Sequence, residues 1–235
     1  MDRLPLVLLP GTLCDARVWR DQVTAFAPER EVIVCELGIE QTLVEEVTRC
    51  LRLLPPSFFL AGFSLGGIAA FEFYRQGKER LAGIALLSTN ARADTQASRT
   101  HRGRLLSMVE AGQMTRVLHE LLLPSYVSGE GEARDSVAAV ITEMAHVTSV
   151  RFRNQCGYAS DRPDSRALLA QMAGPVTLIH GAIDRVTPIE RQAEISQGLP
   201  HATVVVAPGS GHFVTLEAPD VCNLALANWM KVSTG

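Results

Sequence analysis

The chain has 235 residues, of which 47% are hydrophobic and 20% charged, and its formal net charge is −3. That length suits one α/β domain with a sizeable core. So small a net charge gives no overall field that would recruit nucleic acid or an anionic membrane, and we expect neither as a partner. The five cysteines are scattered without C-x-x-C spacing, which argues against a disulfide framework or a zinc site and favours reduced thiols in a cytoplasmic protein.

Strand-like and helix-like segments alternate along the chain. The first apolar run, 4–9, contains Pro5 and is too short for the core of a signal peptide, so we interpret it as a strand. No stretch approaches the length of a membrane span. Next we expect a helix at 18–27, a strand at 31–35, a helix at 43–54, a strand at 57–61, a helix at 65–76 and a strand at 81–88. After residue 166 we expect a strand at 176–180, a helix at 189–197, a strand at 202–206 and a helix at 219–230. Repeated strand–helix units with uniformly apolar strands imply a parallel sheet covered by helices on both faces.

The alternation is interrupted between the fourth and fifth strands. Over residues 93–166 apolar side chains recur at helical spacing and no strand pattern is found. We therefore predict an α/β core formed by residues 1–92 and 167–235, with 93–166 inserted as a small helical cap.

Residues 62–66 read Gly-Phe-Ser-Leu-Gly, the G-x-S-x-G pattern of a nucleophile elbow. A serine on so tight a strand-to-helix turn needs small residues two positions before and after it, and Gly62 and Gly66 fill those places. An expected strand precedes Ser64 and an expected helix follows it, which is the context that the pattern requires. Ser64 is thus the candidate nucleophile.

A serine nucleophile needs a base, and the base in turn needs a group to orient it. His212 follows the strand at 202–206 in a glycine-containing loop, and catalytic side chains in parallel sheets gather beyond the carboxyl ends of strands. Asp184 follows the strand at 176–180 and lies between Ser64 and His212 in chain order, as an orienting acid would. The other histidines and nearby acids occupy the cap, a strand end or a helix and are less suitable: His101, His119, His146, His180, His201, Asp161, Asp164 and Glu190.

Two backbone amides are also needed to stabilise an oxyanion. The N–H of Leu65 is at a helix N-terminus, where the dipole favours negative charge. The loop after the first strand supplies the second amide. Thr12 is its natural donor and Leu13 the near alternative, while Gly11 permits close backbone approach.

With these residues in place, the chain resembles the α/β-hydrolase superfamily of serine hydrolases. The resemblance rests on four segments in the expected order: Leu-Leu-Pro-Gly-Thr-Leu at 8–13, Gly-Phe-Ser-Leu-Gly-Gly at 62–67, Gly-Ala-Ile-Asp-Arg-Val-Thr-Pro at 181–188 and Gly-Ser-Gly-His-Phe at 209–213. The elbow and the small cap are similar to the pimeloyl-carrier-protein methyl ester esterases and related small carboxylesterases. Two features depart from the family pattern. Pro10-Gly11 stands where His-Gly is usual, and the chain begins at the strand that usually comes third, which leaves about six strands.

The resemblance implies a serine hydrolase that cleaves a carboxylic ester or thioester by acyl transfer to water through Ser64, His212 and Asp184. The substrate would be a small ester, including a carrier-bound acyl group, and no metal or organic cofactor is implied. A lyase or acyltransferase on the same triad is an alternative, and so is a non-catalytic ligand-binding protein. The sequence does not indicate the oligomeric state.

The cap holds the candidates for specificity. Its start carries a basic cluster with Asp94 as the only nearby acid: Arg92, Arg99, His101, Arg102 and Arg104. The cluster is either a rim that recognises an anion, such as a carboxylate or an acidic carrier protein, or a solvated helix face. The candidate substrate-binding residues are Leu13, Phe63, Arg102, Tyr158 and Phe213.

Overall fold

The computed structural model describes residues 3–232. Its single sheet has six strands in the order β2-β1-β3-β4-β5-β6, and every neighbouring pair is parallel. The strands are β1 Leu6–Leu9, β2 Val32–Val34, β3 Phe58–Phe63, β4 Leu81–Leu87, β5 Val176–Gly181 and β6 Thr203–Ala207. The predicted parallel sheet of about six strands is confirmed, and each strand overlaps its expected range.

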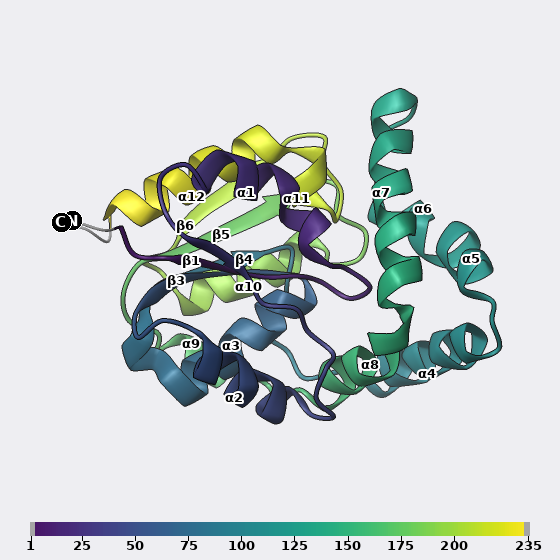
Figure 1. Cartoon of the computed structure of the whole chain (residues 1–235), viewed down its shortest axis with the longest axis horizontal. Helices are drawn as coiled ribbons and strands as arrows, with labels where there is room; N and C mark the ends of the chain where they lie inside the picture. The colour runs from purple at the N-terminus through teal and green to yellow at the C-terminus, as the bar shows by residue number, and fades with distance from the viewer. Residues whose placement is uncertain (1–2, 233–235) are drawn as a thin grey trace.

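Helices cover both faces of the sheet, as Figure 1 shows. One face is covered by α2 (Leu43–Leu53), α3 (Leu65–Gly77), α9 (Arg166–Leu169) and α10 (Ile189–Gly198), with the short turn η2 (Lys78–Arg80) after α3. The other is covered by η1 (Ala16–Trp19), α1 (Arg20–Phe26), α11 (Val214–Glu217) and α12 (Pro219–Val232). Each face encloses its own apolar core, which is why the central strands read as unbroken apolar runs.

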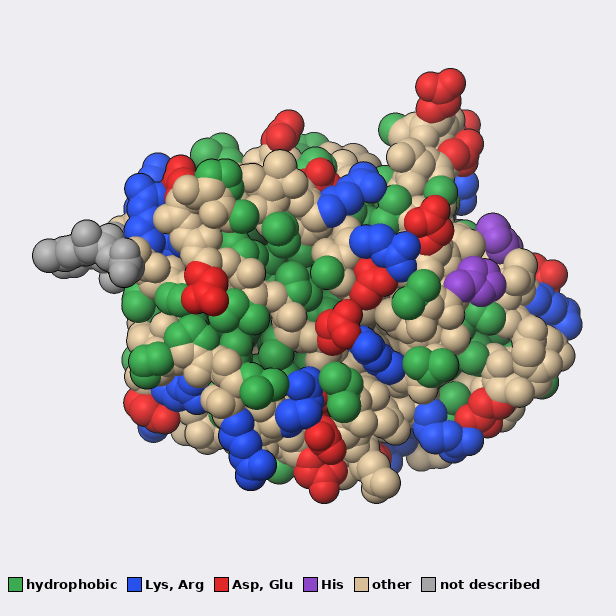
Figure 2. Space-filling view, viewed as in Figure 1, with side chains coloured by type: hydrophobic (Ala, Val, Ile, Leu, Met, Phe, Trp, Pro, Cys, Tyr) green, Lys and Arg blue, Asp and Glu red, His purple; other side chains and the backbone are tan. Residues whose placement is uncertain are grey.

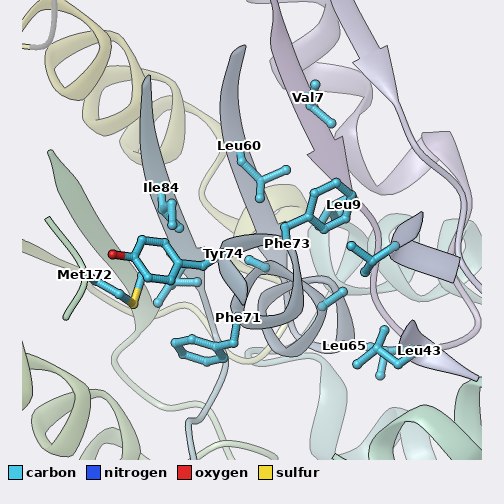
Figure 3. Packing of buried hydrophobic residues seen from close by; sticks show 14 of the residues in the cluster. Val7, Leu9, Leu43, Leu60, Leu65, Phe71, Phe73, Tyr74, Ile84 and Met172 are labelled. Atoms are coloured by element: carbon cyan, nitrogen blue, oxygen red, sulfur yellow. The ribbon is translucent and has the colours of Figure 1, made fainter. Parts of the chain in front are cut away.

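The first of these cores places α3 firmly against the sheet. Figure 3 shows Phe73 and Tyr74 of α3 among strand side chains such as Leu60 and Ile84. All four side chains are at most 8% exposed. Burial of aromatic side chains of this size contributes roughly 1.5–3 kcal/mol each to folding, so the helix that begins at the elbow is held rigidly.

Between β4 and β5 the structure has helices and no strand among the described residues. Apart from α9, which covers the sheet, these elements are α4 (Gln96–Glu110), α5 (Met114–Arg116), η3 (Val117–Leu122), α6 (Leu123–Tyr126), α7 (Glu132–Thr148), η4 (Ser149–Arg151) and α8 (Phe152–Asp161). They lie together beyond one end of the sheet (Figure 1) and share a third apolar core that includes Leu105, Leu118 and Phe152. The division of the chain into core and cap at residues 92/93 and 166/167 stays a prediction.

The surface carries both signs of charge. On the face shown in Figure 2, acidic and basic side chains are interspersed, in keeping with the small net charge. All five cysteines are buried and free. Within residues 3–232, no helix combines the length and the apolar character needed to cross a bilayer.

Candidate active site

Ser64 occupies the turn between β3 and α3 in a conformation that few side chains adopt. Its φ is 52° and its ψ is −110°, and its N–H donates a 2.9 Å hydrogen bond to the carbonyl of Leu87 on β4. A Cβ on Gly62 would lie 2.3 Å from the carbonyl oxygen of Gly66, and one on Gly66 would lie 2.1 Å from that of Leu9. Both glycines are therefore required for strand and helix to approach this closely.

His212 and Asp184 meet Ser64 from two neighbouring loops. Nε2 of His212 lies 3.0 Å from Oγ of Ser64, and Nδ1 lies 2.8 Å from Oδ2 of Asp184. The other carboxylate oxygen of Asp184 accepts hydrogen bonds from the N–H groups of Val186 and Thr187, at 2.8 and 2.9 Å. Asp184 therefore favours the tautomer with hydrogen on Nδ1, which leaves Nε2 free to accept the serine proton.

The carboxylate of Asp184 is held in its charged form. Burial acts to raise its pKa, but His212 and the backbone N–H of Thr187 more than offset this effect, so the pKa lies below its ordinary value. A buried carboxylate that stays ionised can stabilise an imidazolium beside it.

A second histidine, His180, lies beside the carboxylate of Asp184. His180 at the end of β5 is fully buried, with Nε2 3.9 Å from Oδ2 of Asp184. Neither of its ring nitrogens forms a hydrogen bond within residues 3–232, and burial lowers its pKa. Within the described residues, His180 forms no hydrogen bond with Ser64. Its position beside Asp184 makes it part of the packing around that carboxylate.

The two expected oxyanion donors border the cavity at Ser64. Thr12 and Leu65 both line it, and within residues 3–232 no hydrogen bond is made by either of their N–H groups. The N–H of Leu13, in contrast, donates a 2.9 Å hydrogen bond to Oε1 of Gln155. Leu13 is thus already committed to a structural contact, and the geometry favours Thr12.

The cavity has a volume of about 480 Å³, within the range typical of small-molecule sites. Apolar side chains from the core and the cap form much of its lining: Phe63, Ile68, Ala97, Leu105, Leu122, Phe152, Ala159, Val186 and Phe213. Phe63 packs against His212 at 5.2 Å and Phe213 at 5.1 Å between ring centroids, and Phe213 lies 5.8 Å from His212. Two of the three aromatic residues expected to bind substrate therefore flank His212.

Two of the candidate substrate-binding residues lie outside this lining. Tyr158 is 1% exposed, and its single hydroxyl hydrogen is placed between Oε2 of Glu46 in α2, at 2.7 Å, and the carbonyl of Glu40. Tyr158 therefore connects the cap to the core and does not line the cavity. Leu13 is also absent from the lining, because its side chain packs in the third apolar core with Leu105 and Leu118. Arg102 does line the cavity.

Several lining residues were not among the candidate site residues expected from the sequence. Tyr126 at the end of α6 lies 5.8 Å from the ring of His212, and Gln155, Asp94 and Arg162 also border the cavity. Their positions depend on how the cap helices pack, which no local motif records. Among residues 3–232, no group of three or more histidine, cysteine or acidic side chains is arranged to hold a metal ion.

Comparisons with known proteins agree with this geometry. The sequence profile of the Alpha/beta hydrolase family matches residues 6–225. The pimeloyl-[acyl-carrier protein] methyl ester esterase of Nitrosomonas europaea is 29% identical over 173 residues, which are 71% of this chain and 69% of that protein. A thermophilic esterase from Thermogutta terrifontis with malate bound superposes with a TM-score of 0.85 at 25% identity, covering 99% of this chain and 91% of the other. MenH from S. aureus gives 0.87 at 16% identity, with coverage of 100% and 96%, and shows the fold alone. Residues 6–225 include all six strands together with Ser64, Asp184 and His212. The resemblance to this family is therefore confirmed, and the chain is an enzyme of the alpha/beta hydrolase family.

Proposed function

We propose that the protein hydrolyses a carboxylic ester through a covalent acyl-enzyme on Ser64. One observation carries the proposal: the hydrogen-bonded series Asp184–His212–Ser64 ends at a cavity that the N–H groups of Thr12 and Leu65 also border. Nucleophile, base, orienting acid and oxyanion donors are the full set of groups that acyl transfer requires.

Each residue then has a defined part in the reaction. Nε2 of His212 removes the hydroxyl proton as Oγ of Ser64 attacks the ester carbonyl, and Asp184 stabilises the imidazolium that forms. The amides of Thr12 and Leu65 stabilise the oxyanion. His212 gives its proton to the leaving alcohol. It then takes a proton from the water that attacks the acyl carbonyl, and it returns this proton to Oγ of Ser64 as the bond between Oγ and the acyl carbon breaks and the acid leaves.

The comparisons support an ester as the substrate class, since two of the similar proteins are named as esterases. A small ester fits a cavity of about 480 Å³ with a largely apolar lining. A thioester would react through the same steps.

Labelling with a fluorophosphonate tests the nucleophile directly. We expect one adduct on the wild-type protein, none on Ser64→Ala, and normal labelling of the control Ser57→Ala, a serine just before β3. A panel of p-nitrophenyl esters of increasing acyl length should be hydrolysed by the wild type and not by Ser64→Ala. An adduct that persists in Ser64→Ala, or an unlabelled wild type, would refute the proposal. Acyl transfer to an added alcohol in preference to water would instead identify an acyltransferase.

A further inference from the structure

One wall of the cavity carries a charged group that the reaction does not use. It is formed by Arg102 of α4, Arg162 just after α8, and Asp94 before α4. Oδ2 of Asp94 accepts a 2.8 Å hydrogen bond from Nη2 of Arg102, and its Oδ1 lies 3.3 Å from Nη2 of Arg162. The Asp94 side chain is 2% exposed, so a single buried carboxylate serves two guanidinium groups.

The charges on this wall do not balance. Among the described residues that line the cavity, the arginines are Arg102 and Arg162 and the carboxylate is Asp94, so two positive charges face one negative charge on this wall. Arginine does not lose its proton in proteins. A ligand with one negative charge would neutralise this wall.

The two arginines differ in how far their hydrogen bonds are satisfied. Arg162 donates from Nε to the carbonyl of Arg92 at 2.7 Å and from Nη1 to that of Ala159, and it also contacts Asp94. Within residues 3–232, Arg102 has a single hydrogen bond, from Nη2 to Asp94, and its buried Nε has no hydrogen-bond partner there. An unpaired buried donor costs free energy. Of the two arginines, Arg102 is therefore the one with donors available to bind a ligand.

The positive charge of Arg102 also reaches the reacting end of the cavity. Burial raises the pKa of the Tyr126 hydroxyl, and Arg102 acts against that rise. Tyr126 in turn lies beside His212. Apolar lining residues, including Leu105, Leu122 and Phe152, occupy the same cavity.

The rest of the basic cluster lies elsewhere. Arg99 and Arg104 are exposed and do not line the cavity, and Arg92 pairs with Glu194 at 2.8 Å. The side chains of Arg102 and Arg162 are only 26% and 9% exposed, which suits contact with a small molecule inside the cavity better than contact with a carrier protein on the outer surface.

We propose that the substrate is a small ester that bears a second, unesterified carboxylate, and that Arg102 binds this carboxylate. The proposal rests on the proposed ester hydrolysis and names its substrate class. A planar carboxylate matches the donor geometry of a guanidinium, and its single negative charge matches the net charge of the wall, whereas a phosphate group carries about −1.5 to −2.

Matched substrate pairs test this proposal. Monomethyl esters of dicarboxylic acids of increasing length are compared with the same esters in which the second carboxyl group is a primary amide. A further pair carries the carboxylate on the alcohol, as an acetylated hydroxy acid and its amide. We expect the wild type to prefer the carboxylate member of one of these pairs in kcat/KM, with the preference decreasing as salt is added.

Variants then assign the preference to Arg102. In Arg102→Gln the carboxylate-to-amide ratio of kcat/KM should fall about 10- to 100-fold, the range expected when a charged hydrogen-bond donor is lost. Arg104→Gln, an exposed arginine on the same helix, should leave both the activity and the ratio unchanged. Asp94→Asn removes the competing carboxylate and should raise the ratio several-fold, which keeps the test valid if Arg102→Gln fails to fold.

The outcomes separate the two proposals. A wild type that cleaves neutral and carboxylated esters equally well, or a ratio that is the same in Arg102→Gln, would overturn the carboxylate site and leave ester hydrolysis intact. No cleavage of any ester in the panel would instead contradict the proposed function. A loss of preference in Arg104→Gln as large as that in Arg102→Gln would show that the preference depends on the overall positive charge of α4 and not on a site at Arg102, and it would also overturn the proposal.

Discussion

The carboxylate of Glu217 accepts a 2.9 Å hydrogen bond from the backbone N–H of Ser128, although 89 residues separate the two. The same oxygen accepts a bond from the hydroxyl of Ser128 and one from the N–H of Gly211 at 3.0 Å, and the other oxygen accepts one from the N–H of Phe213 at 3.0 Å. Gly211 and Phe213 flank His212, whose own N–H donates to the carbonyl of Tyr126 at 3.1 Å. The cap and the loop that contains His212 are therefore held together.

Removing the Glu217 carboxylate should loosen this connection. Glu217→Ala leaves three backbone N–H donors without their partner, while the hydroxyl of Ser128 can still donate to the carbonyl of Gly209 at 2.7 Å. We expect a loss of about 1–3 kcal/mol in the free energy of unfolding together with a lower kcat. Urea denaturation and ester hydrolysis measure the two effects. Glu143→Ala is the control, because Glu143 is 68% exposed and forms a surface ion pair with Arg17. Equal behaviour of the two variants would show that Glu217 has no special structural role.

The oxyanion loop has a corresponding connection to the cap through Gln155. Its side chain accepts from the N–H of Leu13 and donates to the carbonyl of Leu37 at 3.0 Å, and it is fully buried. In Gln155→Met the loop loses this support, and we expect kcat to fall about tenfold to hundredfold, somewhat less than loss of an oxyanion donor itself. Asn154→Leu is the matched control, since Asn154 donates to the carbonyl of Gly38 and does not bond to Leu13. Similar effects of both variants on kcat would contradict a role for Gln155 in placing the oxyanion donors.

These two connections also show where prediction from the sequence ends. Ser64, Asp184 and His212 could be recognised because each follows a strand directly, and the carboxyl ends of parallel strands meet at one edge of the sheet. Glu217 and Gln155 could not, because their partners come from an inserted cap whose packing has no counterpart in a local pattern. Tyr158 illustrates the same limit: its helical position is obvious, but its bond to Glu46 spans 112 residues. The sequence also left open whether the basic cluster at the start of the cap faces solvent or the cavity. The answer depends on which face of α4 meets the cavity, and that face carries Arg102.

The elbow predicts a sharp contrast between two helical glycines. In Gly66→Ala the new Cβ would clash with the carbonyl of Leu9, so the helix or strand must shift, and we expect a loss of several kcal/mol, above about 3, or a failure to fold. Gly103 lies in α4 with open space around it, and Gly103→Ala should be neutral or stabilising by up to about 1 kcal/mol. Thermal and urea unfolding of both variants make the comparison. A well-folded, active Gly66→Ala would show that the elbow does not need the close approach seen at this position.

Burial of His180 should make the stability of the protein depend on pH. Burial keeps the pKa of His180 below the ordinary value of 6.5. Among the neighbouring charged or titratable groups, Asp184 acts to raise this pKa and His212 to lower it, and Glu190 raises it by a smaller amount. Below pH 6.5 the unfolded chain binds a proton at this residue before the folded chain does, so stability is fully present above that pH and is lost as the pH falls towards the folded-state pKa. The free energy of unfolding should therefore decrease on acidification with a slope of up to about 1.4 kcal/mol per pH unit from this one group. His180→Leu removes the titrating ring and should flatten this part of the curve, whereas the lowered pKa of Asp184 affects stability only at more acidic pH. Urea unfolding at a series of pH values between about 7 and 5 measures both proteins, and an unchanged pH dependence in His180→Leu would show that His180 is not the group responsible.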